Sequence, residues 1–294
     1  MDFIRPEYIL RPSQNLRRIA YGMGMTRANC SAMTPWGLPV SFDPNELHGR
    51  AMLTLGLSVL RTNEIISRLV EPGDTAIDIG ANIGIMTSLM AARAGPTGAV
   101  YAFEPHPETR KHLESNVRSW TTCNRLTAPV SVLPYAISRS SGEAALYEPG
   151  QFSANSGLAS LENSSGQGGA GTARIAVETV SFDEWADGIG QIKLVKIDVE
   201  GHEDSVLDGM EATLAAKRID HLIFEEMRPL PSPATERLTD HGYACYMIDR
   251  SFWGPLLTPD RAGPSRLQSE ATNVLAAKNS NARGLIGYGW SCLR

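Results

Sequence analysis

The chain has 294 residues, of which 42% are hydrophobic and 20% charged, and its formal net charge is −5. This composition is typical of a globular protein with one large domain, or one domain and an appendage. The 27 basic residues form no dense run, which argues against nucleic acid as a partner. Four widely spaced cysteines favour neither a disulfide framework nor a metal knuckle.

The N-terminal region gives no sign of export or membrane insertion. The first 18 residues, MDFIRPEYILRPSQNLRR, lack the uninterrupted apolar core of a signal peptide. The longest apolar stretch nearby, AMLTLGLSVL at 51–60, is too short to cross a bilayer. We therefore expect a cytoplasmic protein with no membrane segment.

Residues 1–57 show no sustained hydrophobic periodicity, which indicates a short N-terminal cap rather than an independent domain. Residues 58–294 are expected to form the main domain. Its first helix covers 61–70 and ends at Glu71-Pro72-Gly73, since proline and glycine terminate helices.

Strand-like and helix-like segments then alternate along the chain. The expected strands cover 75–79, 99–103, 131–137, 192–199, 221–226, 243–248 and 272–277, and the expected helices cover about 82–93, 107–119, 203–216 and 231–241. Several strands are continuous apolar runs, as in a parallel sheet that is covered on both faces. The pattern predicts a doubly wound α/β fold with a mostly parallel sheet and helices on both faces.

Residues 138–180 form an insertion that is longer than a usual crossover between strands. Its middle, NSSGQGGAGT at 163–172, is rich in glycine and serine, whereas the flanking EAALY and ARIAVETV are able to pair as a hairpin. Two interpretations stay open, a solvated loop without a role and a lid over the substrate.

The stretch DTAIDIGANIG at 74–84 has the form of a strand that enters a glycine turn and then a helix. A dinucleotide fingerprint, GxGxxG, needs a second glycine for the pyrophosphate, but Asn82 and Ile85 replace the second and third glycines here. The remaining pattern, Asp78, Gly80 and Gly84, suits a nucleoside cofactor with an amino-acid tail and no phosphate, and Asn82 within the turn is predicted to contact it too. Asp78 would attract the ammonium of that tail, and Gly80 would let the backbone approach the ligand.

S-adenosylmethionine fits this description. Glu104 ends the second strand, where its carboxylate is able to accept both ribose hydroxyl hydrogens, and Pro105 follows it at the same predicted site. Tyr135 and Ala136, at the end of the third expected strand, would form the wall for adenine. Ile83 either contacts the cofactor or packs under the helix.

Three stretches together resemble the FkbM family of S-adenosylmethionine-dependent methyltransferases: IDIGANIG at 77–84, AFEPHPE at 102–108 and LVKIDVEGHEDSVLDGM at 194–210. The resemblance covers about residues 60–277, and KIDVEGHE is its most specific part. It implies a Rossmann-like class I methyltransferase fold, usually with seven strands and the last antiparallel. It also implies O-methylation of a hydroxyl on a small molecule, either a natural product or a sugar.

The acids and the histidine of KIDVEGHE follow the fourth strand, at the edge where such sheets bind ligands. Asp198 is the first candidate for the base or for holding the acceptor hydroxyl, because it ends the apolar strand and is expected to be the least solvated of this group. It is also predicted to contact the cofactor. Glu200 is the second candidate. His202 either takes the proton or packs before the helix. A divalent metal held by Asp198 with Glu225 or Glu226 is a less favoured alternative.

Other functions stay open at this level. A nicotinamide- or flavin-dependent oxidoreductase on a similar sheet is the main rival, although Asn82 and Ile85 argue against it. A protein or RNA methyltransferase and a cofactor-binding module without catalysis are the others. The acceptor pocket is expected to draw on the cap, the 138–180 insertion and SFWGPLL at 251–257. Homodimer formation is left open.

Overall fold

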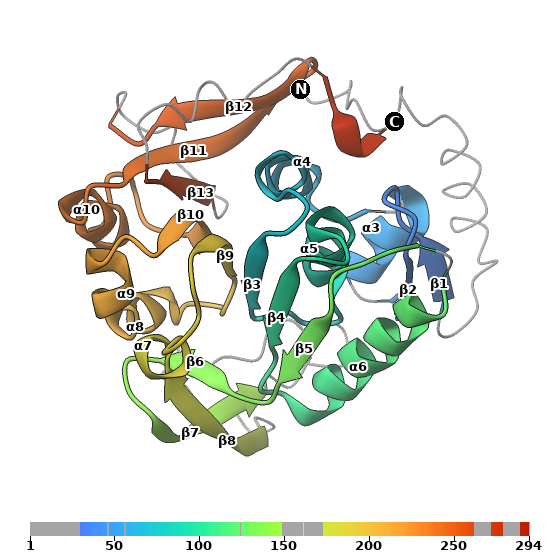
Figure 1. Ribbon diagram of the computed structural model, residues 1–294, viewed down its shortest axis with the longest axis horizontal. Helices are drawn as coiled ribbons and strands as arrows, with labels where there is room; N and C mark the ends of the chain where they lie inside the picture. The colour runs from blue at the N-terminus through green and yellow to red at the C-terminus, as the bar shows by residue number, and fades with distance from the viewer. Residues whose placement is uncertain are drawn as a thin grey trace.

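The computed structural model describes residues 30–45, 47–55, 57–123, 125–148, 161, 173–261, 272–278 and 289–293. Within these ranges the central element is an eight-stranded sheet in the order β12-β11-β13-β10-β9-β3-β4-β5 (Figure 1). Its strands are β3 (Thr75–Ile79), β4 (Ala99–Phe103), β5 (Val130–Leu133), β9 (Ile192–Ile197), β10 (Ile219–Glu226), β11 (Ala244–Ser251), β12 (Gly254–Pro259) and β13 (Thr272–Ala277).

The predicted mostly parallel sheet is confirmed. Strands β5, β4, β3, β9 and β10 are parallel neighbours, whereas β13 lies antiparallel between β10 and β11. This is the seven-stranded order with one antiparallel strand that the family resemblance implies. The eighth strand, β12, pairs with the edge of β11 and comes partly from SFWGPLL. Its sequence, GPLLTP, carries two prolines, which an edge strand tolerates but which hide it from sequence patterns.

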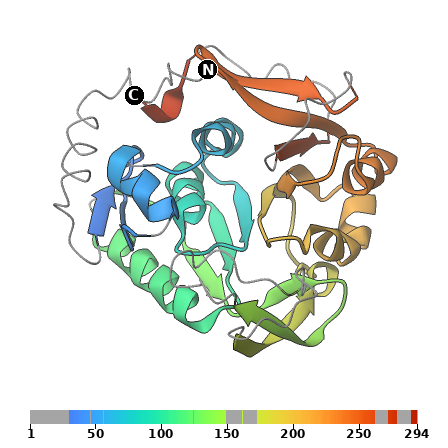
Figure 2. The same ribbon diagram turned by 180° about the vertical axis from the view of Figure 1, so that it is seen from behind.

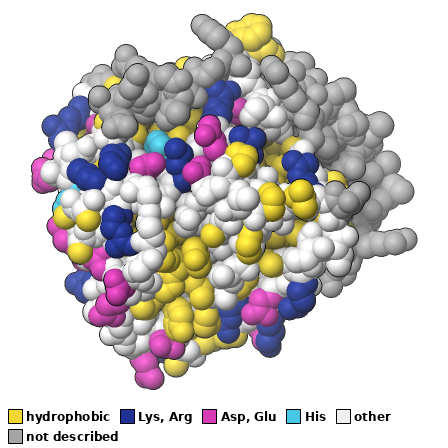
Figure 3. Space-filling model, viewed as in Figure 1, with side chains coloured by type: hydrophobic (Ala, Val, Ile, Leu, Met, Phe, Trp, Pro, Cys, Tyr) yellow, Lys and Arg dark blue, Asp and Glu magenta, His cyan; other side chains and the backbone are white. Residues whose placement is uncertain are grey.

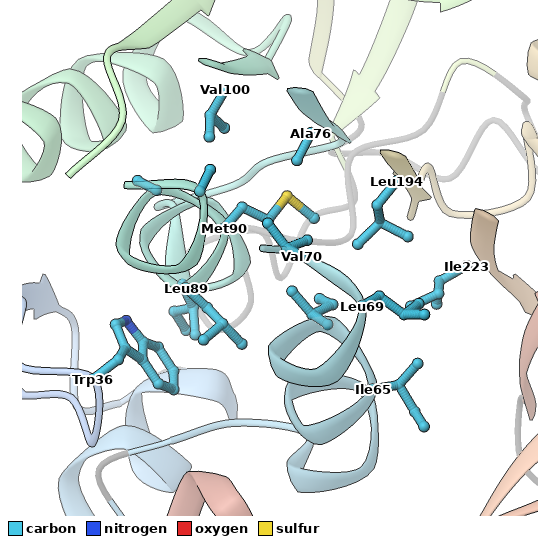
Figure 4. Close-up of a cluster of buried hydrophobic side chains, with 14 of the residues drawn as sticks. Trp36, Ile65, Leu69, Val70, Ala76, Leu89, Met90, Val100, Leu194 and Ile223 are labelled. Carbon is cyan, nitrogen blue, oxygen red and sulfur yellow. The ribbon is translucent and has the colours of Figure 1, made fainter. Parts of the chain in front are cut away.

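Helices cover both faces of the sheet. On one face lie α4 (Leu60–Leu69), α5 (Ile85–Ala94) and α6 (Pro107–Thr121); on the other lie α7 (Phe182–Trp185), α8 (Glu203–Asp208), α9 (Glu211–Ala215) and α10 (Pro233–Asp240). Figure 4 shows Leu69 of α4 and Met90 of α5 packing toward Ala76 and Leu194 of the sheet. No helix in the described ranges is both long and apolar enough to span a membrane.

Two expected helices differ from the structure. The helix expected from residue 82 begins at Ile85, because Asn82 and Gly84 have the positive φ angles of a turn, +51° and +91°. The helix expected over 203–216 is divided into α8 and α9 around Gly209. A Cβ on Gly209 would lie 2.0 Å from the carbonyl oxygen of Ser138, so the chain passes too close to its neighbour for any other residue.

The third expected strand, 131–137, is also divided. It ends at Leu133 in β5, and after Pro134 the chain starts β6 (Ala136–Ser138) in a separate sheet. That sheet has the order β6-β8-β7, with β7 (Gly142–Glu148) antiparallel to β8 (Ala173–Ser181). The predicted hairpin is therefore confirmed, whereas its middle, 163–172, lies outside the described residues. This inserted sheet lies at the bottom of both views, far from the β11–β12 hairpin at the top (Figures 1 and 2).

The described part of the N-terminal region consists of β1 (Cys30–Met33), β2 (Pro39–Phe42) and α3 (Leu47–Leu55). The indole of Trp36 donates to Ser88 Oγ of α5 over 2.9 Å, and the indole of Trp120 on α6 donates to the carbonyl of Pro39 over 2.7 Å. This region shares the apolar core of the helices it covers. A domain boundary at residue 57 stays a prediction.

The C-terminal segment 289–293, with the short helix η4 (Ser291–Leu293), is fixed to α4 by Glu64. The fully buried carboxylate of Glu64 accepts hydrogen bonds from the backbone N–H groups of Ser291 and Cys292, each over 2.9 Å, and from Arg68 over 2.7 Å. Burial alone would raise the pKa of Glu64, but these donors outweigh it and hold the pKa below its usual value.

The turn of the β11–β12 hairpin rests on this same C-terminal segment. The indole of Trp290 donates a hydrogen bond to the carbonyl of Phe252, and the backbone N–H of Gly289 donates one to the carbonyl of Trp253. The described part of the insertion, the β6-β8-β7 sheet, lies at the opposite end of the molecule from SFWGPLL (Figure 1), so a pocket shared by the two stays a prediction without support from the described residues. Sequence order gives no sign of this separation.

Candidate functional site

Asp78 lies at the end of β3 and is completely buried. Its Oδ2 accepts a hydrogen bond of 2.6 Å from Thr87 Oγ1, and its Oδ1 forms an ion pair of 3.5 Å with Lys196 Nζ. Among the described residues no group donates a hydrogen bond to Oδ1. Burial raises the pKa of Asp78 above its ordinary value, against the opposing effects of Lys196 and Thr87.

The two glycines of the turn, Gly80 and Gly84, are both required by the conformation and packing of the chain. Gly80 has a φ of +76°, and a Cβ there would lie 1.8 Å from the carbonyl oxygen of Asp198. Gly84 has a φ of +91°, and a Cβ there would lie 2.5 Å from Leu113 Cδ1 on α6. Packing within the protein accounts for both residues, so a contact between either glycine and a cofactor stays a prediction.

Glu104 follows β4 and faces the same turn. Its Oε2 accepts from the backbone N–H of Asn82 and its Oε1 from that of His106, both over 2.9 Å. Burial raises the pKa of Glu104 to about 7, although these two backbone donors oppose the shift. Each carboxylate oxygen has a second lone pair, which leaves capacity for further donors. The structure thus brings together Asn82 and Glu104, two of the residues predicted to bind the cofactor.

The apolar residues predicted to contact the cofactor lie in less favourable places. Ile83 is only 5% exposed and belongs to the core beneath α5. Ala136 starts β6 and packs with Leu146 of the inserted sheet, so it does not end a strand of the main sheet. Tyr135 is half-buried in the link before it, and Pro105 is half-buried beside Glu104. The adenine wall was predicted from a continuous third strand, which the structure does not have.

Asp198 directly follows β9, and its backbone N–H donates to the carbonyl of Ile79 over 3.0 Å. Its carboxylate lies 3.0 Å from Lys196 Nζ, and its side chain is 42% exposed. The expectation that Asp198 is the least solvated acid is therefore wrong, because β9 ends one residue before it. Glu226, an acid of the same group of candidates, is only 4% exposed, and Asp78 on the neighbouring strand is completely buried.

Two further carboxylates lie near Asp198. Glu225 is level with it across the sheet, because Phe224 of β10 pairs with Ile197 of β9. Glu200 occupies a turn with a φ of +52°. Burial, followed by repulsion from Asp198, raises the pKa of both Glu200 and Glu225 to about 7.

The remaining polar residues of this edge have structural partners. His202 is 9% exposed, and its Nε2 shares a hydrogen bond of 3.0 Å with Ser138 Oγ of β6. Glu203 accepts from two backbone N–H groups of the preceding turn, over 3.3 Å each. Glu226 points to the other face of β10, where it binds the guanidinium of Arg228. The described residues contain no set of three or more His, Cys, Asp or Glu side chains arranged to hold a metal ion.

The inserted sheet contacts both halves of this edge. Glu148, the last residue of β7, pairs with His106, whose backbone N–H binds Glu104. Ser138 of β6 binds His202 on the other side. The described part of the insertion therefore joins the segment after β4 to the segment after β9, and a role of the insertion as a lid over the substrate stays a prediction.

Lys196 is the residue at this site that sequence reasoning missed. It is 6% exposed and contacts Asp78, Asp198 and the carbonyl of Gly80. Burial alone would lower the pKa of Lys196, but the carboxylates of Asp198 and Asp78 raise it above its ordinary value. A lysine within the apolar run LVKIDV is the sequence signal that marks it.

A largely parallel sheet with acids grouped at the carboxyl ends of β3, β4, β9 and β10 defines a Rossmann-like α/β protein, a class in which ligands bind at that edge. Residues 78–245, more than half of the chain, match the family model described as the methyltransferase FkbM domain. The chain therefore belongs to the FkbM methyltransferase family, whose members use S-adenosylmethionine.

Two curated proteins are also similar in sequence. The hexuronic acid methyltransferase AglP of Haloferax volcanii is 32% identical over 173 residues, which cover 56% of this chain and 63% of that protein. The AMB antimetabolite synthetase AmbE of Pseudomonas aeruginosa is 30% identical over 192 residues, which cover 53% of this chain and 9% of that protein. The chain thus spans less than two thirds of the length of either relative.

Two solved structures are also similar. A methyltransferase FkbM from Methylobacillus flagellatus aligns with a TM-score of 0.45 and 14% identity, over 69% of this chain and 43% of that one. A SAM-dependent O-methyltransferase from Thermotoga maritima aligns with a TM-score of 0.41 and 17% identity, over 74% of this chain and 64% of that one. Membership of the family rests on the sequence match.

Proposed function

We propose that this protein transfers a methyl group from S-adenosylmethionine to a hydroxyl oxygen of a small molecule that contains a sugar. Family membership supports the methyl transfer. The relative named for hexuronic acid methylation supports a sugar acceptor. The observation that carries the choice of a hydroxyl is the position of Glu200 and Glu225 beside Asp198, since both acids bind protons near neutral pH.

The residues of the turn fit the cofactor that the family implies. Asp78 Oδ1 is a buried acceptor that forms an ion pair of 3.5 Å with Lys196 and accepts no hydrogen bond from any described group, and it would take the ammonium of the cofactor as a further partner. Glu104 is held in place by two backbone N–H groups and retains lone pairs for the ribose hydroxyls. Bound S-adenosylmethionine supplies an electrophilic methyl group.

The work left to the protein is to orient the acceptor and to remove its proton. An aliphatic hydroxyl is a weak nucleophile until it loses its proton, and a general base is most effective when its pKa is near the working pH. Glu200 and Glu225 meet that condition, whereas Asp198, which is partly exposed and paired with Lys196, is suited to hold the hydroxyl. His202 serves mainly to join α8 to the inserted sheet.

The acceptor is small rather than a nucleic acid. On the face shown in Figure 3, the described basic side chains are scattered among acidic ones and form no continuous stripe of the kind that binds phosphate backbones. The inserted sheet is the proposed wall of the acceptor site, because it contacts the segments that follow both β4 and β9. Cytoplasmic location and homodimer formation stay predictions from the sequence.

The test is turnover of the purified protein with S-adenosylmethionine and a panel of neutral hexosides, hexuronic acids, a protein extract and RNA. We expect release of S-adenosylhomocysteine, and a product one methyl group heavier, with a hydroxylated sugar. Methylation of protein or RNA alone, or reduction of a nicotinamide cofactor, would contradict the proposal. Parallel assays with a chelator test whether a divalent metal takes part.

Variants then assign the acids. Glu225→Gln and Glu200→Gln should lower kcat toward a hydroxyl acceptor by roughly 100-fold for whichever acid is the base, in line with general-base contributions. Asp198→Asn should raise KM for the acceptor more than it lowers kcat. Glu236→Gln, an exposed acid on α10, is the matched control and should behave like the natural protein. Unchanged turnover in all three site variants would remove these acids from the mechanism.

A further inference from the structure

Lys196 is the one basic side chain that the structure places between the two halves of the proposed site, among the described residues. Its ammonium lies 3.0 Å from Asp198 Oδ2, 3.5 Å from Asp78 Oδ1 and 3.5 Å from the carbonyl oxygen of Gly80. Asp78 belongs to the predicted cofactor side and Asp198 to the predicted acceptor side. Lys196 thus contacts both sides and the turn that separates them.

The sheet register fixes this arrangement. Lys196 is the direct partner of Asp78 across the parallel pair β9–β3, and directly opposed residues point to the same face. Asp198 is two residues after Lys196, so the alternation along an extended chain brings it to that face as well. Gly80 is in contact with the backbone of Asp198, as the 1.8 Å position of its hypothetical Cβ shows. The ammonium therefore lies where two chain segments meet.

The charges at this point require a cation. Asp78 is completely buried, and an isolated charged carboxylate there would be strongly disfavoured. Asp198, Glu200, Glu203 and Glu225 add further negative charge at the same edge, and burial, followed by repulsion among these acids, raises the pKa of Glu200 and Glu225. Lys196 opposes that repulsion for both glutamates. A buried lysine is costly, so its presence here calls for a role beyond packing.

We propose that Lys196 is a positioning residue for methyl transfer, which holds Asp78 and Asp198 at a fixed separation and keeps both carboxylates available for their ligands. This inference rests on the proposed function. Lys196 acts on the cofactor through Asp78 and on the acceptor through Asp198, and it contacts neither ligand itself. The effect of Lys196 on cofactor affinity should therefore depend on the presence of Asp78.

A double-mutant cycle with S-adenosylhomocysteine tests this dependence, because binding of that product needs no acceptor and no turnover. Lys196→Met removes the charge and retains an apolar stem of similar length. We expect it to weaken binding by roughly 10-fold or more at neutral pH, as for loss of a partner to a buried charge. Without the cation Asp78 binds its proton more readily, so the pH below which S-adenosylhomocysteine binding is lost should be higher in the variant.

Asp78→Asn should weaken binding to a similar extent, and the double variant Asp78→Asn/Lys196→Met should bind no more weakly than Asp78→Asn alone. The double variant carries no unpaired buried charge, so it tests the inference even if Lys196→Met alone does not fold. Lys196→Arg should restore the natural pH limit. Lys193→Met is the control on the same strand, since Lys193 pairs with Asp220 at 3.8 Å, away from the site residues.

The outcomes separate the two proposals. Additive losses in the cycle, or a Lys196→Met variant with lowered thermal stability but natural affinity and pH limit, would assign Lys196 a merely structural role and overturn the inference. A protein that binds S-adenosylhomocysteine but methylates no hydroxyl would contradict the proposed acceptor, while the cycle would still decide the role of Lys196. Absence of any binding by the natural protein would overturn both.

Discussion

The hydrogen bond from Thr87 to Asp78 offers a direct measure of how much the buried acid contributes. Thr87→Val removes the hydroxyl and keeps the branched shape, so Asp78 Oδ2 loses the donor at 2.6 Å. Both side chains are completely buried, so water does not replace the bond. A hydrogen bond to a charged group contributes about 1.5–3 kcal/mol. We therefore expect S-adenosylhomocysteine to bind roughly 10- to 150-fold more weakly at neutral pH.

The loss of affinity in Thr87→Val should depend on pH. Burial already raises the pKa of Asp78, and the Thr87 hydroxyl opposes that rise. Its removal raises the pKa further, so the variant should approach the natural affinity as the pH is increased. Calorimetric titrations over a range of pH, with urea unfolding of the same samples, separate affinity from stability. Thr121→Val, at an exposed hydroxyl on α6, is the control. Natural affinity at every pH in Thr87→Val would refute the reasoning.

Three more predictions concern stability. Glu64→Gln removes the buried charge that Arg68 and two backbone N–H groups bind, and should lower the free energy of unfolding in urea by about 3–5 kcal/mol. The backbone amides of 289–293 should then exchange hydrogen faster, and an unchanged exchange rate would contradict this prediction. Gly80→Ala combines a left-handed φ with an overlap on Asp198 and should cost at least ~2 kcal/mol, measured in the same way. The pKa of Glu225, raised from 4.5 to about 7, should make the free energy of unfolding fall as pH rises through that window, and Glu225→Gln should flatten the fall.

Much of the sheet could be predicted because its central strands are apolar on both faces. The bounds of β3, β4 and β13 agree with the expected 75–79, 99–103 and 272–277. Such runs of buried residues leave little choice of structure. Strand β12 was missed because its prolines are typical of turns, and β6 was joined to β5 because an apolar run across Pro134 does not reveal a change of sheet.

The sequence could predict the positions of those candidate site residues that lie at the ends of strands. Asp78 and Glu104 each close an apolar strand, and parallel neighbours bring such ends together. Glu225 and Glu226 were grouped as if both faced the site, although adjacent residues of a strand point to opposite faces. Lys196 could not be found in this way, because its partner Asp78 is far away in sequence and the register of β3 on β9 is known only from the structure.

The close approach of the Asp198 carbonyl to Gly80 bears on how this family is compared across genomes. The glycine is required by the protein's own backbone, whether or not any ligand is bound. A descendant that had lost catalysis would still need glycine at this position to fold. Retention of the glycine therefore reports an intact architecture and carries no information about catalysis.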